Sequence, residues 1–215
     1  MTEVSRSSIR ARLRTAAVCL VSSVAVPAVA MAQVPSRAPS AVDNRHTAAD
    51  VRFMQGMITH HAQAVVMSAL IPQRTDNKTL RMLGERITVS QRDEIAMMRS
   101  WLADRKEWAP DPLAPNAMGG HDMSMPGMKA DAMMPGMLTP EQMTQLAQAN
   151  GKEFEKLFLA GMIQHHGGAL TMVAELFASP GAGQEGTMFR FASDVDADQR
   201  AEITRMKAML AALQK

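Results

Sequence analysis

Aromatic residues, cysteine and long apolar runs are all scarce in this sequence. Its 215 residues include no tyrosine and a single cysteine, and only 4% are aromatic. One cysteine cannot form an intramolecular disulfide or a cysteine-based zinc site. No uninterrupted apolar stretch reaches the ~20 residues that a transmembrane helix requires. A packed hydrophobic core, a bound metal ion, or both must therefore hold the fold together.

The first 32 residues have the pattern of a secretory signal peptide. Four arginines precede a short apolar run from Ala16 to Val26, and Ala30 and Ala32 form a small-x-small cleavage pattern before Gln33. We predict cleavage here, a disordered N-terminus over residues 33–45, and a mature protein that is periplasmic or secreted, without stable membrane insertion. A retained membrane anchor is the alternative, which the shortness of the apolar run disfavours.

Cleavage would also change the charge of the protein. It would remove four basic residues, one acid and Cys19, leaving 19 basic and 20 acidic residues and a formal charge near −1. Nucleic-acid binding needs a concentrated basic face, so this balance disfavours it. Methionine is unusually frequent, since 19 of the 21 methionines lie beyond the predicted cleavage point. Methionine fills irregular cores well, so the positions of these residues must show whether packing explains the excess.

Two pairs of similar segments show that the sequence contains an internal repeat. Residues 53–67 read FMQGMITHHAQAVVM, and residues 158–172 read FLAGMIQHHGGALTM, at an offset of 105 residues. Residues 90–98 read SQRDEIAMM, and residues 198–206 read DQRAEITRM, at an offset of 108 residues. Each half of the chain is therefore predicted to contain two segments joined by a turn.

The hydrophobic pattern predicts an all-α fold. Apolar residues recur at spacings of three and four in all four segments, which is typical of amphipathic helices. We predict that residues 46–107 form one αα-hairpin, that residues 139–215 form a second, and that residues 108–138 form a long linker rich in methionine, proline and glycine. Two such hairpins bury their apolar stripes best against each other, which predicts a four-helix bundle.

Local signals predict where these helices begin and end. Pro72 disfavours continuation of the first helix, and Thr75 or Asp76 offers an N-cap for the second. In the stretch LTPEQ, Thr139 offers an N-cap and Gln142 completes a capping box. We therefore expect helices to start directly after these caps.

Two adjacent histidines occupy the same place in each half of the repeat, and each pair follows a methionine. In the first half, Met57 stands three and four residues before His60 and His61. Side chains at these spacings are neighbours on a helix. The second half repeats the arrangement with Met162, His165 and His166. A hydrogen-bonded core role is the alternative for any single histidine, but the repetition favours a metal site.

The ligand types favour a soft metal ion. Helix-bundle di-iron sites place a glutamate three residues before the histidine, whereas this sequence places a methionine there. Thioether and imidazole ligands suit Cu(I), or silver by the same logic, better than iron, magnesium or calcium. Zinc would accept the histidines but gains little from methionine. Further sulfur ligands are expected along the same helices and in the second segment of each half, namely Met67, Met98, Met172 and Met206.

Polar residues near these stripes are candidates for orienting the imidazoles from a second layer. This set consists of Asp50, Gln91, Glu94, Glu155, Gln199 and Glu202. Hydrogen bonding within the core is an equally good interpretation for the two glutamines. Simple solvation is the alternative for Glu94 and Glu202.

The predicted linker contains a second candidate cluster. It reads HDMSMPGMKADAMMPGM over residues 121–137, and its proposed ligands are His121, Met123, Met125 and Met128. Methionines in an unpacked segment have no core to fill, so metal capture explains them better than packing does. An oxidisable spacer without a binding role is the alternative.

The motifs of both halves resemble those of one protein family. The patterns D-x-x-F-M-x-x-M-I-x-H-H-x-x-A-x-x-M and Q-R-x-E-I-x-x-M resemble the domain of unknown function 305 family, the CopM-like proteins, over about residues 45–213. The resemblance implies a ferritin-like four-helix bundle, export to the periplasm, and copper binding or copper resistance. It also implies two ligand sets, which would be Met57, His60, His61 and Met98 in one half and Met162, His165, His166 and Met206 in the other. The sequence departs from the family pattern at Glu155, where aspartate is expected, and in its methionine-rich linker.

These observations lead to one expected function and two alternatives. We predict a periplasmic copper-binding protein, not an enzyme, that sequesters copper or passes it to another periplasmic copper carrier. A ferritin-like metal oxidase acting on iron, manganese or copper is the first alternative, and it would need a carboxylate cage with an open coordination position. A helical interaction module that grips other proteins through methionine-rich surfaces is the second.

Overall fold

Every regular element in the described part of the chain is a helix. The structure is a computed structural model, and it describes residues 46–112 and 133–214. The helices are α1 (Ala48–Ala69), α2 (Ile71–Arg74), α3 (Lys78–Asp104), α4 (Pro140–Gln148), α5 (Gly151–Ala178) and α6 (Gly186–Ala212). None of these helices is long and apolar enough to cross a membrane. The predicted all-α fold class is therefore confirmed for these residues.

Part of what the sequence predicts falls outside the described ranges. The signal peptide over residues 1–32 and the N-terminus over residues 33–45 lie there. So does most of the linker, including the candidate ligands His121, Met123, Met125 and Met128. Only residues 108–112 and 133–138 of the linker are described.

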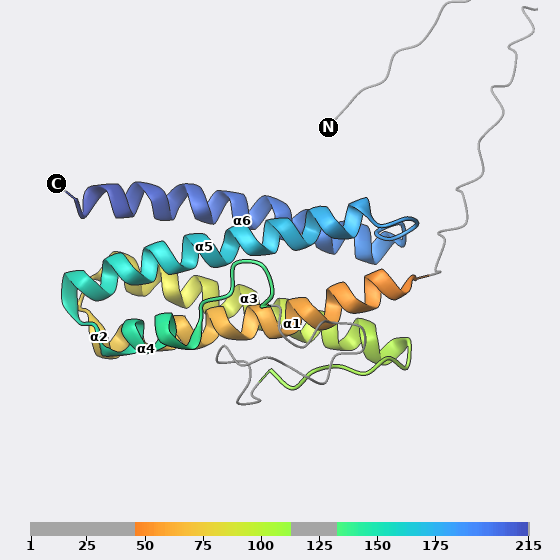
Figure 1. The fold of residues 1–215 in the computed structure, drawn as a ribbon, viewed down its shortest axis with the longest axis horizontal. Coiled ribbons are helices and arrows are strands. Elements are labelled where there is room, and N and C mark those ends of the chain that lie inside the picture. The colour runs from red at the N-terminus through yellow and green to blue at the C-terminus, as the bar shows by residue number, and fades with distance from the viewer. Residues whose placement is uncertain (1–45, 113–132, 215) are drawn as a thin grey trace, which may run out of the picture. The chain divides into compact units, whose positions relative to one another are not determined.

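The four long helices lie side by side as two antiparallel pairs (Figure 1). The helix α1 packs along α3, α5 packs along α6, and α1 also contacts α5. The turn between α1 and α3, which contains α2, lies at the opposite end of the helices from the turn between α5 and α6. The start of each half is therefore close to the turn of the other half.

The turn between α1 and α3 differs from the prediction in its cap. Pro72 lies in the first turn of α2, and the N-cap of α3 is Asn77, whose side chain accepts a hydrogen bond from the backbone N–H three residues later. The prediction of Thr75 or Asp76 as the cap is wrong, because both side chains are engaged elsewhere. The Thr75 hydroxyl donates to Glu155 at 2.5 Å, and Asp76 pairs with an arginine at 2.8 Å.

The second half begins with an additional short helix. Thr139 caps α4 as predicted, because its side chain and that of Gln142 form a capping box. The helix ends at Gln148, however, and α5 starts at Gly151. The φ angle of Gly151 is 55°, in the left-handed region that glycine adopts readily. Residues 139–215 therefore contain three helices, where the prediction had two.

Two acids at equivalent positions of the repeat tie each half to the turn of the other. Asp50, near the start of α1, accepts a 2.7 Å hydrogen bond from the backbone N–H of Gly183 in the α5–α6 turn. Glu155, near the start of α5, accepts bonds of 2.5 Å from Thr75 and 3.0 Å from Asn77. We predicted that these acids orient the imidazoles, but their carboxylates bind the turns instead. Ten residues of helix, about 15 Å, separate each acid from its histidine pair.

Two apolar clusters fill the core, one on each side of the histidines. On α1, the first cluster ends at Ile58 and the second begins at Ala64, so His60 and His61 fall between them. On α5 the order is reversed, because the second cluster ends at Met162 and the first resumes at Ala169. The histidines therefore lie in a polar layer that apolar side chains shield from both ends.

Removing either linking acid should destabilise the fold. In Asp50→Ala or Glu155→Ala, donors in the opposite turn lose their acceptor, and the free energy of unfolding should fall by about 1–3 kcal/mol. Urea unfolding followed by circular dichroism measures the loss. Glu175→Ala removes an exposed acid from α5 and should change stability by less than about 0.5 kcal/mol. Equal stability of all three variants would contradict the proposed link between the halves.

Candidate metal centre

Four histidines form a buried layer between the helices. His60 and His61 come from α1, His165 and His166 come from α5, and none is more than 1% exposed. The rings of His60 and His165 lie with their centroids 3.8 Å apart and their planes tilted by 39°. Within each pair the centroids are 6.4 Å and 6.1 Å apart, because adjacent residues on a helix point about 100° apart. Packing of α1 against α5 thus brings the two repeated pairs together.

One histidine of each pair binds a glutamate from the neighbouring helix. His61 Nε2 lies 2.5 Å from Glu94 Oε2 on α3, and His166 Nε2 lies 2.7 Å from Glu202 Oε2 on α6. The two contacts occupy equivalent positions of the repeat. Glu94 and Glu202 therefore lie where residues that orient imidazoles would be expected.

Both glutamates are held in the ionised form. Burial alone would raise the pKa of Glu94, but the hydrogen bond and the charge of His61 outweigh burial and hold that pKa below its usual value. The pKa of Glu202 is lowered in the same way, since His166 and Arg86 together outweigh burial. A carboxylate accepts hydrogen bonds but does not donate them, so Nε2 of each contacting histidine must carry the proton.

The other two histidines donate to backbone carbonyls. His165 Nε2 lies 2.9 Å from the carbonyl oxygen of His60, and His60 Nε2 lies 3.0 Å from the carbonyl oxygen of Pro135. A carbonyl oxygen only accepts, so Nε2 carries the proton in these rings as well. The two halves differ at this point. The symmetry of the repeat would have His60 donate to the carbonyl of His165, but His60 donates to the carbonyl of Pro135 at the end of the linker.

Residues 133–138 of the linker dock against the histidine layer, which the sequence analysis did not anticipate. Leu138 exchanges two hydrogen bonds with the side chain of Gln63, at 2.8 Å and 3.0 Å. Gly168 makes room for the segment, because a Cβ atom there would lie 1.9 Å from the Pro135 carbonyl oxygen. Gln63 and Gly168 occupy the same position of the repeat. This exchange of glutamine for glycine is the sequence signal that could have revealed the docking.

The other ring nitrogen, Nδ1, is buried in all four histidines and has no hydrogen-bond partner among the described residues. Since Nε2 carries a proton, any ring that is neutral presents a lone pair at Nδ1. An unsatisfied buried polar atom costs about 1–3 kcal/mol, and native structures contain few of them. Four in one layer fit metal binding, because imidazole binds a metal through its unprotonated nitrogen.

Burial keeps two of these rings neutral. It lowers the pKa of His60 from 6.5 to about 3, with the charge of His61 adding to the effect and the bond to Pro135 opposing it. Burial, followed by the charges of His60 and His166, also holds the pKa of His165 well below its usual value. Near neutral pH both rings are therefore in the form that binds a metal ion.

The predicted methionine ligands are buried and divide between the two apolar clusters. Met57 and Met98, the sulfur ligands of the first predicted set, both lie in the first cluster. Met162 and Met206, those of the second set, both lie in the second cluster. The remaining two candidates lie in the cluster that holds the ligands of the other half. Met172, from the second half, lies in the first cluster, and Met67, from the first half, lies in the second. The two sulfur atoms of each set therefore lie in the same apolar cluster.

A further methionine reaches this region from the linker. A Cβ atom at Gly56 would lie 3.5 Å from Met134 Sδ and 3.3 Å from Met172 Cε. Met134 stands in the same methionine-rich stretch as the predicted linker ligands but was not among them. Glycine at position 56 allows both thioether side chains to approach α1 closely.

The two glutamines do not act as predicted. Gln91 on α3 and Gln199 on α6 are buried, but no hydrogen bond joins either to a histidine in the described ranges. The Oε1 atom of each has no partner there. Each stands three residues before the glutamate of its own helix, so two more unsatisfied acceptors lie near the histidine layer.

The candidate donor set is mixed rather than built from one ligand type. Within residues 46–112 and 133–214, no group of three or more His, Cys, Asp or Glu side chains is placed to hold one metal ion. The buried candidate donors are the imidazole nitrogens of the layer and the thioether sulfurs of the two flanking clusters.

Nuclear magnetic resonance of the metal-free protein tests the ring assignments. With 15N-labelled histidine, His60 and His165 should show the tautomer protonated at Nε2. Both should remain neutral at pH 5, because burial holds the pKa of His60 near 3 and depresses that of His165. Between about pH 6.5 and 3, these two histidines bind protons in the unfolded chain but not in the folded protein. The free energy of unfolding should therefore fall as the pH drops through this window. A doubly protonated ring at pH 5, or protonation at Nδ1, would contradict the assignment.

Known structures resemble the described chain over most of its length. A DUF305 protein from Streptomyces coelicolor that is predicted to be secreted has a TM-score of 0.63 and 30% sequence identity, covering 77% of this chain and 94% of that one. CopM in its Cu(II)-bound form has a TM-score of 0.56 and 27% identity, covering 76% of this chain and 96% of that one. The fold and part of the sequence are therefore shared with these proteins.

Sequence comparison identifies the family. The uncharacterized protein L153 of Acanthamoeba polyphaga mimivirus is 40% identical over 57 residues, which is 26% of this chain and only 38% of that protein's length. Residues 50–210 match the family described as Domain of unknown function (DUF305). The matched range includes both histidine pairs and both glutamates that bind them. The protein therefore belongs to the DUF305 family.

Proposed function

We propose that this protein binds copper, mainly as Cu(I), and sequesters it or passes it on outside the cytoplasm, in support of copper tolerance or homeostasis. The observation that carries the proposal is the layer of four buried histidines whose Nδ1 atoms have no partner among the described residues. The likeness to CopM, a relative known in a Cu(II)-bound form, supports copper as the metal.

The proposed ligands form two sets, one for each half of the repeat. The first set is Met57, His60, His61 and Met98, and the second is Met162, His165, His166 and Met206. Imidazole nitrogen supplies affinity for copper in either oxidation state, while thioether sulfur favours the softer Cu(I) ion. Silver should bind by the same logic. Division of the sulfur ligands between two clusters supports two sites rather than one.

We further propose that the two halves are αα-hairpins of a ferritin-like four-helix bundle. The pairing of α1 with α3 and of α5 with α6 supports this arrangement. The methionine-rich linker would capture ions through His121, Met123, Met125 and Met128, which lie outside the described residues. Its described end reaches His60 through the carbonyl of Pro135, which favours transfer of captured ions to the histidine layer.

The proposed location follows from the predicted signal peptide and from the relatives. A periplasmic or secreted protein would meet copper outside the cytoplasm, where another copper carrier would be its partner. The likeness to a DUF305 protein that is predicted to be secreted supports this location.

Binding and transfer explain the site better than catalysis or protein docking. A ferritin-like metal oxidase would use carboxylates as bridges between metal ions. Here both oxygens of Glu94 and both oxygens of Glu202 already accept hydrogen bonds from protein groups. A methionine-based docking module would need accessible sulfur atoms, whereas the four methionines of the proposed sets are fully buried.

Copper binding should depend on the histidine layer. Anaerobic titration with Cu(I), in competition with a chromogenic chelator, should show saturable binding to the unmodified protein. The double variant His60→Ala/His61→Ala should bind fewer ions, because it removes the nitrogen ligands of one set. His165→Ala/His166→Ala should do the same for the other set.

The control for this titration is His46→Ala. His46 lies just before α1, 5.5 Å from the ring of Trp101 and outside the layer, so its loss should leave copper binding unchanged. Circular dichroism would establish that each variant is folded. Unchanged stoichiometry and affinity in both folded double variants would rule out the proposed sites.

The glutamates should tune affinity without setting the number of ions bound. Glu94→Gln and Glu202→Gln keep the side-chain size but remove the charge that holds the imidazole tautomer. Loss of such an orienting group typically lowers metal affinity by about 10–100-fold. The same competition titration measures this loss, with the exposed acid variant Glu153→Gln as control. Unaltered affinity would contradict the orienting role, and a lost ion would make the glutamate a direct ligand.

A further inference from the structure

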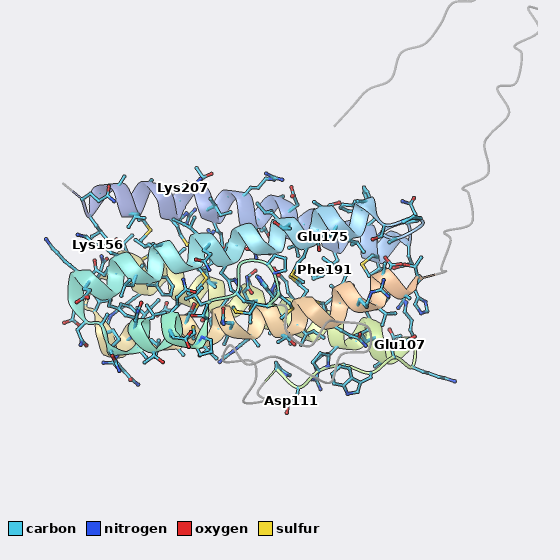
Figure 2. The ribbon with its side chains drawn as sticks, viewed as in Figure 1. Glu107, Asp111, Lys156, Glu175, Phe191 and Lys207 are labelled. Carbon is cyan, nitrogen blue, oxygen red and sulfur yellow. The ribbon has the colours of Figure 1, made fainter. Side chains whose placement is uncertain are left out.

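A groove between α3 and α6 leads to the glutamate that binds His61. Its volume is about 380 Å³, and Phe191, labelled in Figure 2, forms part of its apolar wall. Met97 adds a thioether to the lining. The charged groups that line the groove are the carboxylates of Asp93, Glu94, Asp194 and Asp198 and the guanidinium of Arg190. Four carboxylates against one guanidinium make the groove acidic.

The carboxylates of the groove are close enough to repel one another. Burial raises the pKa of Asp198, and the charges of Glu94, Glu202 and Asp194 add to this effect, while the charge of Arg86 opposes it. A cation in the groove would relieve this repulsion. An acidic cleft with apolar walls also raises the local concentration of cations and speeds their association.

Glu94 connects the groove to a buried ring. Its side chain is 19% exposed, while that of His61, only 2.5 Å away, is 0% exposed. The other carboxylate oxygen of Glu94 accepts a hydrogen bond from the neutral hydroxyl of Ser90. An ion at Glu94 is therefore one side chain away from a ring whose Nδ1 has no partner among the described residues. The groove thus ends one side chain short of a candidate ligand.

The equivalent position in the second half is closed. Glu202 is the counterpart of Glu94, but its side chain is only 9% exposed, and its outer oxygen accepts a 3.1 Å hydrogen bond from Arg86. Asp194 occupies the position of the repeat that Arg86 holds in the first half. The guanidinium of Arg86 therefore covers Glu202, whereas the carboxylate of Asp194 lines the same groove as Glu94. An arginine at this place both blocks the approach and repels a cation.

We infer that a metal cation enters the core through the acidic groove between α3 and α6 and reaches the His61–Glu94 pair before the His166–Glu202 pair, which Arg86 closes. The inference rests on the proposed copper binding and adds an entry route and an order of loading to it. The two sites share ligand types but differ in their access to solvent.

The order of loading is measured with silver nitrate in chloride-free buffer. In the full-length protein with 15N-labelled histidine, substoichiometric silver should shift the ring resonances of His61 before those of His166. The variant Arg86→Gln uncovers Glu202 and should make the two rings respond more nearly together. Simultaneous filling in the unmodified protein, or earlier filling of His166, would overturn the order.

The entry route is measured as a rate. Stopped-flow mixing with silver nitrate should show association slowed by about 10-fold in Asp194→Asn/Asp198→Asn at low ionic strength, since focusing of the field accounts for at least that much in charged clefts. The difference should shrink in about 0.5 M sodium nitrate, where charges are screened. The matched control Glu153→Gln/Glu175→Gln removes two exposed acids from α5, one of them labelled in Figure 2, and should associate at the rate of the unmodified protein.

The outcomes separate this inference from the proposal on which it rests. If silver shifts none of the four buried rings, soft-metal binding fails, and the entry route fails with it. If silver shifts both pairs and the groove variants associate at the unmodified rate, binding stands and the route is wrong. If the control variant slows as much as the groove variant, net charge and not the groove sets the rate, and the route is again wrong.

Discussion

The hydrogen bonds at Nε2 of the four buried histidines are the interactions on which the rest of the site depends. Each acceptor, whether a carboxylate or a backbone carbonyl, is a group that cannot donate, so all four rings carry their proton on the same nitrogen. The other nitrogen, Nδ1, has no partner in any of the four rings among the described residues. Glu94, Glu202 and the docked segment around Pro135 matter because they supply these acceptors.

A layer of unsatisfied polar atoms is costly, and the surrounding structure offsets the cost. Apolar clusters close the layer from both ends, burial keeps His60 and His165 neutral, and Nδ1 of all four rings has no partner among the described residues. Asp50 and Glu155 hold the two halves together at opposite ends, far from the histidines, so the packing that shields the layer does not rely on the ligands themselves. The hydrogen bonds that join the two halves therefore lie away from the histidine layer.

The departures from the repeat give the two halves different surroundings. Glycine at position 168, where the first half has Gln63, lets the linker dock on one side only. Arginine at position 86, where the second half has Asp194, covers one glutamate and leaves the other beside an acidic groove. The two copies of the motif therefore differ in what covers them.

The sequence by itself determined the four long helices, the repeat and the candidate ligands, because hydrophobic period, caps such as Thr139 and the His-His spacing are local properties. Tertiary structure alone decided how those ligands are used. The ring of His60 binds a carbonyl 75 residues away, His165 binds one 105 residues away, and Asp50 binds a turn 133 residues away. Neither these partners nor the cap at Asn77 could be read from spacing, since which donor meets which acceptor depends on how helices far apart in the chain pack against each other.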